Sequence, residues 1–268
     1  MFKICDEDFN LMKIADSGQC FRMDQIENGN WSVIALDHYC EAVVEDLGTV
    51  TVYCADDENG FWKEYFDLDT DYAQFRRSAD KEDPFLCSAV EFGKGIRILK
   101  QDPWEMLITF IISQRKNIPA IKSCVEKLCS RWGKEIREGI YAFPTPEELS
   151  RAALSELCDC SLGYRAEYVY LAAKAVNSGE LDLDRLKTLS DDDLMSELLK
   201  LKGVGVKVAN CVSLFGFYRI AAFPIDVWID RVQKSFYSGH FPVEKYHGYA
   251  GIMQQYIFYY ARKEMLKL

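Results

Sequence analysis

Short runs of apolar and β-branched residues mark the N-terminal part of the chain, and clusters of Asp, Asn and Gly separate them. The runs cover residues 31–36, 41–44 and 49–53. Strands of this length with turn residues between them are typical of antiparallel β-hairpins. We therefore expect a β-rich N-terminal domain over residues 1–95.

The apolar spacing changes to that of helices from about residue 67 onward. Over 118–132, apolar side chains recur every three to four residues, which predicts a helix with one buried face. Asp102 stands directly before Pro103, and a cap residue followed by proline is typical of a helix start. We expect residues 96–268 to form a mostly helical region, so the predicted fold class is α+β.

The overall composition is that of an ordinary globular protein. Apolar residues make up 49% and charged residues 28% of the 268 residues. The longest nearly apolar stretch, residues 106–112, is far shorter than the ~20 residues needed to cross a bilayer. The ten cysteines are scattered and form no CxxC…CxxC array, so we expect reduced thiols and no structural zinc. We expect a cytoplasmic protein with no targeting signal and no membrane partner.

Acidic residues are concentrated at the N-terminal end. The 42 acidic and 32 basic residues give a formal net charge of −10. Residues 1–80 contain 18 acidic and 6 basic residues, which leaves 24 acidic and 26 basic residues in 81–268. Because the larger part of the chain is almost neutral, the overall charge does not exclude a nucleic-acid partner.

A Gly-x-Gly turn between two predicted helices is the most informative local pattern. Gly203 and Gly205 permit a tight turn and a close backbone approach, and a second helix is expected to begin near Val206. The unpaired N–H groups at such a helix start bind phosphate oxygens, which suits sequence-independent gripping of a nucleic-acid backbone. An ordinary corner between two helices explains the two glycines by themselves at least as well.

Lys207 and Asp226 add candidate chemistry to this turn. Lys207 lies in the first turn of the second helix, in an apolar segment, and both the helix dipole and partial burial favour an uncharged, nucleophilic amine. Asp226 is placed to cap the following helix, and a carboxylate there can also face the lysine across a cleft. The alternatives are a solvent-exposed lysine and an aspartate that only caps its helix.

Several motifs, in the same order along the chain, resemble those of the 8-oxoguanine DNA glycosylases of the helix–hairpin–helix–GPD superfamily. Ser17–Arg22 and Leu162–Tyr168 are similar to the family motifs Ser-Gly-Gln-x-Phe-Arg and Leu-Gly-Tyr-Arg-Ala-x-Tyr. The superfamily signature is matched by Gly203, Gly205, Lys207 and Asp226. The resemblance spans 17–258. It implies an antiparallel β-sheet N-terminal domain followed by a two-lobed all-helical region, with the helix–hairpin–helix motif and the catalytic aspartate within 190–235.

The resemblance implies a bifunctional enzyme that excises 8-oxoguanine from duplex DNA after flipping the nucleotide out of the helix. Lys207 would attack the sugar C1′ and expel the base, and β-elimination from the resulting Schiff base would cut the strand. Asp226 would position the lysine and stabilise oxocarbenium character. This chemistry requires no cofactor. The partner is double-stranded DNA containing 8-oxoguanine, and the protein is expected to act as a monomer.

The resemblance also assigns recognition roles. The backbone carbonyl of Gly18 would accept a hydrogen bond from N7, which carries a hydrogen in 8-oxoguanine and a lone pair in guanine. Phe258 and Cys211 would cover the two faces of the flipped base, and Gln254 would read its Watson–Crick edge. Tyr164 would wedge into the duplex and Arg165 would contact the orphaned partner base. The remaining DNA-binding residues would be Arg115, Asn117, Gly203 and Gly205.

The chain departs from the eukaryotic members of the family at the residues that read the opposite strand. Arg115 stands where those members insert an asparagine, and Ala120 stands where they place an arginine that reads the opposite cytosine. Because a good bidentate base contact contributes ~1–3 kcal/mol of discrimination, we expect a relaxed opposite-base preference. A structural monovalent or calcium ion at the hairpin is a further expectation, held by the backbone carbonyls of Leu199, Leu201 and Val204.

Two other classes of function remain open at this stage. One is another helix–hairpin–helix glycosylase, for instance one that acts on alkylated purines. Relatives with an iron–sulfur cluster carry four closely spaced cysteines after the catalytic aspartate, whereas Cys211 is the last cysteine here, so no such cluster is expected. The other class is a non-catalytic DNA-binding module, because hairpins of this kind often only grip the backbone.

Overall fold

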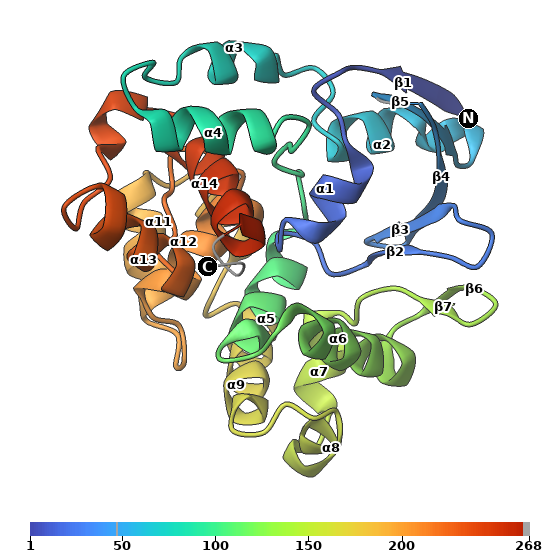
Figure 1. Ribbon diagram of the computed structural model, residues 1–268. Helices are drawn as coiled ribbons and strands as arrows, with labels where there is room; N and C mark the ends of the chain where they lie inside the picture. The colour runs from blue at the N-terminus through green and yellow to red at the C-terminus, as the bar shows by residue number, and fades with distance from the viewer. Residues whose placement is uncertain (47, 265–268) are drawn as a thin grey trace.

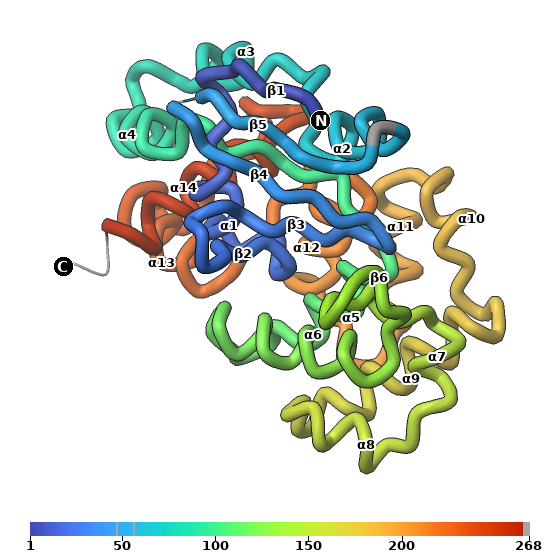
Figure 2. Tube along the Cα trace, turned by 90° about the vertical axis from the view of Figure 1, so that its right-hand side faces the viewer, coloured from blue at the N-terminus to red at the C-terminus, as the bar shows by residue number. Residues whose placement is uncertain are grey.

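A five-stranded antiparallel sheet forms the N-terminal part of the computed structural model, which describes residues 1–46 and 48–264. The strand order is β1-β5-β4-β3-β2, and Figure 2 shows the strands side by side. Their bounds are β1 (Phe2–Cys5), β2 (Met23–Gln25), β3 (Trp31–Ala35), β4 (His38–Asp46) and β5 (Thr49–Tyr53). The three predicted strands are confirmed as β3, β4 and β5, although β4 is longer than the run at 41–44.

Three short helical segments accompany the sheet. They are α1 (Leu11–Asp16), the 3₁₀ helix η1 (Asp56–Glu58) and α2 (Asn59–Tyr65). The sequence pattern did not predict these three segments. Helices of six or seven residues are too short to show a repeating apolar period, and a neighbouring sheet decides whether they form.

The other helices form two groups with α5 (Pro103–Ser113) between them (Figure 1). One group contains α3 (Tyr72–Arg77), α4 (Pro84–Phe92), α10 (Leu183–Lys187), α11 (Asp191–Leu199), α12 (Val206–Phe215), α13 (Val227–Phe236), η2 (Val243–Tyr246) and α14 (Ala250–Glu264). The other contains α6 (Ile118–Trp132), the hairpin β6 (Glu135–Arg137) and β7 (Ile140–Tyr141), α7 (Pro146–Arg151), α8 (Leu154–Asp159) and α9 (Arg165–Asn177). The predicted α+β class with a two-lobed helical region is confirmed.

The central helix α5 begins as its sequence predicts. Asp102 is the N-cap, and its carboxylate accepts the backbone N–H of Glu105 at 2.8 Å, while Pro103 occupies the first turn. All nine residues from Trp104 to Ile112 are buried. A helix that is buried all round lies inside a core, so α5 can carry side chains to cavities on several sides.

Buried apolar residues divide into a sheet cluster and a larger helical cluster. Leu86 and Ala89 of α4 precede residue 95 but belong to the helical cluster, whereas Leu99 belongs to the sheet cluster. The two cores therefore interleave in sequence around residue 95. The division into domains 1–95 and 96–268 stays a prediction.

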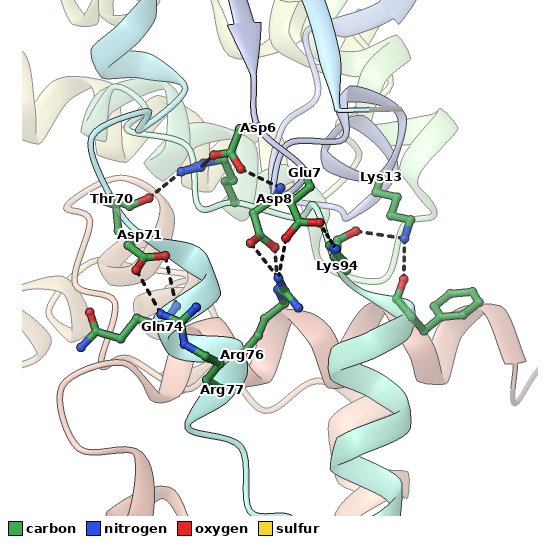
Figure 3. A network of polar contacts seen from close by, with 12 residues as sticks. Asp6, Glu7, Asp8, Lys13, Thr70, Asp71, Gln74, Arg76, Arg77 and Lys94 are labelled. Atoms are coloured by element: carbon green, nitrogen blue, oxygen red, sulfur yellow. Dashed lines mark hydrogen bonds and ion pairs between the residues drawn. The ribbon is translucent and has the colours of Figure 1, made fainter. Parts of the chain in front are cut away.

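A network of ion pairs ties the segment after β1 to the helical part (Figure 3). Asp8 is buried and accepts from Arg76 of α3 through Nε at 2.5 Å and Nη2 at 2.8 Å. The fully buried Arg97 donates to Asp6 at 3.1 Å and to the Thr70 carbonyl at 2.6 Å. Charges this deeply buried need such partners, so the network fixes where the connector 96–101 runs beside the sheet.

Candidate active site

Lys207 lies in the first turn of α12, directly after the glycine hairpin. Gly205 is the N-cap of this helix and has an extended backbone. The lysine is half-buried, and its Nζ lies 5.5 Å from the centre of the Phe110 ring on α5. The alternative of a fully solvent-exposed lysine does not describe this placement. The hairpin and the central helix together direct the amine toward the interior.

Asp226 is the N-cap of α13. Its Oδ1 accepts the backbone N–H groups of Trp228 at 3.0 Å and of Ile229 at 2.9 Å. Burial raises the pKa of Asp226 above its ordinary value, and the two N–H groups and the charge of Lys207 oppose that rise. The capping role is therefore present, and the same carboxyl group is also electrostatically coupled to the lysine.

Lys207 and Asp226 line one cavity of about 580 Å³. The residues around it come from the loop after α1, from α5, from the start of α6 and from α14, and they include Gly18, Phe110, Ile118 and Phe258. Gly18 has a φ of +76°, and a Cβ there would lie 3.3 Å from the Phe258 ring. A side chain at residue 18 would therefore be strained and would crowd the ring, so glycine suits a close approach to the cavity.

A smaller adjoining pocket brings in the other predicted base-recognition residues. It is lined by Cys211 and Gln254 together with Gly18, Lys207 and Phe258. The Cys211 thiol is buried, and this burial raises its pKa while the neighbouring Lys207 lowers it. Gln254 donates to the carbonyl of Pro224 at 3.0 Å. Six predicted catalytic and base-recognition residues from four separate segments thus meet in one place.

Arg115 and Asn117 lie between α5 and α6, at the edge of the same region. Both are exposed and line a further cavity with Lys207 and Asp226. Arg115 has a φ of +52°, and Asn117 caps α6 by accepting the backbone N–H of Ala120 at 2.9 Å. The connection between α5 and α6 is thus fixed by the Asn117 cap, and Arg115 is exposed to solvent.

Tyr164 and Arg165 lie at the start of α9, outside the described cavities that contain Lys207. Tyr164 is 51% exposed, as a residue that wedges into a duplex would have to be. Arg165 is buried, and its guanidinium lies over the Tyr164 ring at 4.4 Å. It donates to the carbonyls of Leu162, at 3.2 Å, and of Gln114. The proposed contact of Arg165 with a partner base stays a prediction, because in the free protein its guanidinium is committed to backbone.

The hairpin itself depends on Gly203. This residue has a φ of +86°, and a Cβ there would lie 2.2 Å from the Tyr168 ring. Its carbonyl accepts from the Gln114 side chain at 3.0 Å, which links the hairpin to the α5–α6 connection. A Cβ at Gly205 would meet no described atom within 4 Å, so the two glycines serve different purposes.

The predicted ion site involves the turn that precedes Gly203. Leu199 ends α11, and the Leu201 carbonyl already accepts the backbone N–H of Val204 at 3.1 Å. Within residues 1–46 and 48–264, no group of three or more His, Cys, Asp or Glu side chains could hold a metal ion. An ion held by the carbonyls of Leu199, Leu201 and Val204 stays a prediction.

Charged residues at the rim of the cavity were missed by the sequence analysis. Asp16 pairs with Arg262 and Lys263 of α14, and all three line the cavity. Trp228, on the first turn of α13, lines both the main cavity and the one beside it. Asp16 directly precedes the Ser17–Arg22 motif, which was an available signal. Nothing in the spacing of Arg262 indicates that it reaches this loop.

Two family descriptions together cover most of the chain. Residues 1–107 match the 8-oxoguanine DNA glycosylase, N-terminal domain, and residues 108–244 match the HhH-GPD superfamily of base excision DNA repair proteins. The chain belongs to the HhH-GPD superfamily of base excision DNA repair proteins. Within that superfamily, it carries the N-terminal domain of the 8-oxoguanine DNA glycosylases. The family predicted from the sequence is confirmed.

Individual relatives agree with this assignment. A probable N-glycosylase/DNA lyase of Methanothermobacter thermautotrophicus is 30% identical over 75% of this chain and 74% of its own length. The N-glycosylase/DNA lyase of Saccharomyces cerevisiae is 38% identical over 54% of this chain, and the match covers 42% of the yeast protein. The chain is therefore similar to proteins named for both glycosylase and lyase activity.

Solved structures cover nearly the whole chain. The Clostridium acetobutylicum 8-oxoguanine glycosylase/lyase, in complex with double-stranded DNA containing cytosine opposite 8-oxoG, is 38% identical with a TM-score of 0.89. The match spans 96% of this chain and 93% of that one. A 3-methyladenine DNA-glycosylase from Archaeoglobus fulgidus, 23% identical with a TM-score of 0.77, shares the fold.

No described helix is both long and apolar enough to cross a membrane.

Proposed function

We propose that this protein is a bifunctional DNA glycosylase that excises 8-oxoguanine from duplex DNA and then cleaves the strand at the abasic site. One observation carries the proposal: Lys207 and Asp226 open onto the same cavity as Gly18 and Phe258. An amine nucleophile, a coupled carboxylate, a close backbone approach and an aromatic face are the parts that base excision with lyase chemistry needs.

Lys207 is the proposed nucleophile. Its nitrogen lone pair forms a bond to C1′ while the glycosidic bond breaks, and the base leaves with the bonding electrons and takes up a proton. The bonded amine then loses its protons while the C1′–O4′ bond of the sugar breaks and O4′ takes up a proton, which gives an open-chain Schiff base. The Schiff base acidifies the C2′ hydrogen, so removal of that proton breaks the C3′–O bond and expels the 3′ phosphate. Asp226, held by two backbone N–H groups, would stabilise the positive charge that develops on the sugar.

Base discrimination would depend on the Gly18 carbonyl. The carbonyl can accept a hydrogen bond from the N7–H of 8-oxoguanine, whereas guanine presents a lone pair there. Phe258 would stack on one face of the base and Cys211 would cover the other. Gln254 would read the Watson–Crick edge, and to do so it has to exchange its bond to Pro224 for one to the base.

DNA outside the pocket would be held by backbone and side-chain groups around the hairpin. Gly203 shapes the turn, and the N–H groups at the start of α12, after Gly205, suit a phosphate. Tyr164 would fill the vacated stack, and Arg115 and Asn117 face the same region. Ala120 offers no side-chain donor to an opposite cytosine, which supports a relaxed opposite-base preference. We propose a monomer acting on chromosomal DNA in the cytoplasm, with no cofactor in the reaction and an ion only at the hairpin.

Borohydride trapping on a duplex with a single 8-oxoguanine tests the proposal. A covalent adduct forms only through an amine–sugar Schiff base, so the wild type and Lys234→Gln should give it and Lys207→Gln should not. Lys234 is a suitable control because it is an exposed lysine that pairs with Asp230 on α13.

The other outcomes separate the remaining classes. Excision of 8-oxoguanine without an adduct would indicate a monofunctional glycosylase. An adduct that forms only on an alkylated-purine or preformed abasic duplex would contradict the proposed substrate. Binding of all duplexes with neither excision nor adduct would indicate a non-catalytic DNA-binding module.

A further inference from the structure

The loop that carries Gly18 is held by a buried network of side-chain amides. Gln19 is fully buried, and its Nε2 donates to the Ser17 hydroxyl at 2.9 Å and to the Arg97 carbonyl at 2.8 Å. Its Oε1 accepts the backbone N–H of Leu99 at 2.8 Å. The Gln19 backbone carbonyl accepts in turn from the side chain of Gln101, at 2.9 Å. Every polar group of the Gln19 side chain is thus engaged.

These bonds fix both neighbours of Gly18. Ser17, on one side, receives a bond from Gln19 and donates its own hydroxyl to the Ile14 carbonyl at 2.8 Å. Gln19, on the other side, is held through its side chain and through its backbone carbonyl. Because Gly18 has no side chain and has a φ of +76°, it does not restrict its own peptide orientation. The orientation has to come from residues 17 and 19.

The network continues to the ion pairs of Figure 3. Arg97, which accepts from Gln19 through its carbonyl, uses its guanidinium to hold Asp6 and the Thr70 carbonyl. The connector 96–101 is therefore held by Gln19 through the Arg97 backbone and by Asp6 and Thr70 through the buried Arg97 guanidinium. Buried polar groups that are held by several hydrogen bonds favour a single rigid arrangement.

We infer that Gln19 is a positioning residue for base selection: it sets the direction of the Gly18 carbonyl, and Gln101 supports it. Gln19 touches neither substrate nor the reacting atoms, since it is buried and is absent from the linings of the described cavities that contain Lys207. The inference rests on the proposed function and adds which residues set its specificity. A displacement of a recognition group by about 1 Å can lower a rate by about 10²-fold.

The test compares two activities of the same protein. Excision of 8-oxoguanine requires the Gly18 carbonyl, whereas cleavage of a preformed abasic site does not, because no base remains to be read. In Gln19→Met, which keeps the length and removes the hydrogen bonds, excision should fall by about 10- to 100-fold. Lyase activity on the abasic duplex should stay within about twofold of the wild type. Gln101→Met removes one bond of the network and should give a smaller loss of the same kind.

Gln25→Met is the matched control. Gln25 is exposed on β2 and donates to the Gly29 carbonyl at 3.0 Å, so its loss should change neither activity. An unchanged ratio of excision to lyase activity in both Gln19→Met and Gln101→Met would overturn the inference, whether the activities stay high or fall together. Absence of 8-oxoguanine excision by the wild type would instead overturn the proposed function, and this inference with it.

Discussion

Lys207 and Asp226 occupy the first turn of α12 and the N-cap of α13, and the two helix starts open onto one cavity. Asp226 follows Lys207 by nineteen positions in sequence, and the fold places the start of α13 beside the same cavity as the start of α12. The positive ends of both helix dipoles therefore meet where an anionic substrate has to bind. This geometry also makes the two residues separable by experiment.

Replacing Asp226 with Asn should separate its capping role from its charge. Asn is as good an N-cap as Asp, so the free energy of unfolding should change by less than about 1 kcal/mol. Loss of the carboxylate should lower single-turnover excision by about 10²–10³-fold. Thermal unfolding and single-turnover kinetics measure the two effects. Nearly normal excision with a large loss of stability would show that Asp226 is only a helix cap.

Asp226 also predicts an acid limb in the pH profile of the wild type. Its pKa is raised by burial, so the carboxylate that the reaction needs is lost as the pH falls through that raised value. Excision should therefore decline at a higher pH than an ordinary aspartate would cause, and the residual activity of Asp226→Asn should lack this limb. An identical acid limb in both proteins would assign the titration to another group.

The two hairpin glycines should respond differently to alanine. Gly203→Ala introduces a Cβ into the Tyr168 ring at a positive φ, so it should destabilise the protein by about 1–3 kcal/mol and displace the hairpin. Gly205→Ala meets open space at an extended backbone and should be almost neutral for stability. Thermal unfolding with DNA-binding measurements checks both, and equal effects of the two changes would contradict this assignment of roles.

Glu105 makes stability depend on pH. Burial raises the pKa of this carboxyl to about 7, with Arg22 opposing the rise. Because the folded state binds the proton more tightly than the unfolded state, stability from this group is present at low pH and is lost as the pH rises from about 4.5 to about 7. At ~1.4 kcal/mol per pKa unit, the loss is about 3 kcal/mol.

Glu105→Gln removes this titration. The difference in unfolding free energy between pH 5 and pH 8 should therefore be smaller in Glu105→Gln than in the wild type, as measured by denaturant unfolding at both pH values. Glu147→Gln, a change at an exposed carboxylate on α7, is the control and should retain the wild-type difference. An unaltered pH dependence in Glu105→Gln would contradict the raised pKa.

The opposite-base preference should be weak. Ala120 has no donor for an opposite cytosine, and the guanidinium of Arg165 is bonded to the carbonyls of Leu162 and Gln114. Excision rates on otherwise identical duplexes with cytosine or adenine opposite the lesion should differ by much less than several hundredfold. A preference of that size would mean that Arg165 leaves its backbone partners when DNA binds.

The sequence predicted local secondary structure correctly where neighbouring residues decide it. The Asp102 cap followed by Pro103, the amphipathic helix at 118–132 and the three strands at 31–53 depend on side chains within a few positions of each other, and all are present in the structure. The short helices α1 and α2 were missed, because tertiary packing rather than local periodicity stabilises segments of that length.

The sequence by itself determined the class of fold, the glycine hairpin and the residue types of the candidate site. Only the tertiary structure decided that Asp16 meets Arg262, that Arg165 turns inward to Gln114, and that Gln19 holds the loop around Gly18. Each of these contacts joins segments far apart in the chain, except for the short-range bonds around Gly18 itself. The packing of helices and sheet against one another decides such long-range contacts, and the spacing of residues along the chain does not predict them.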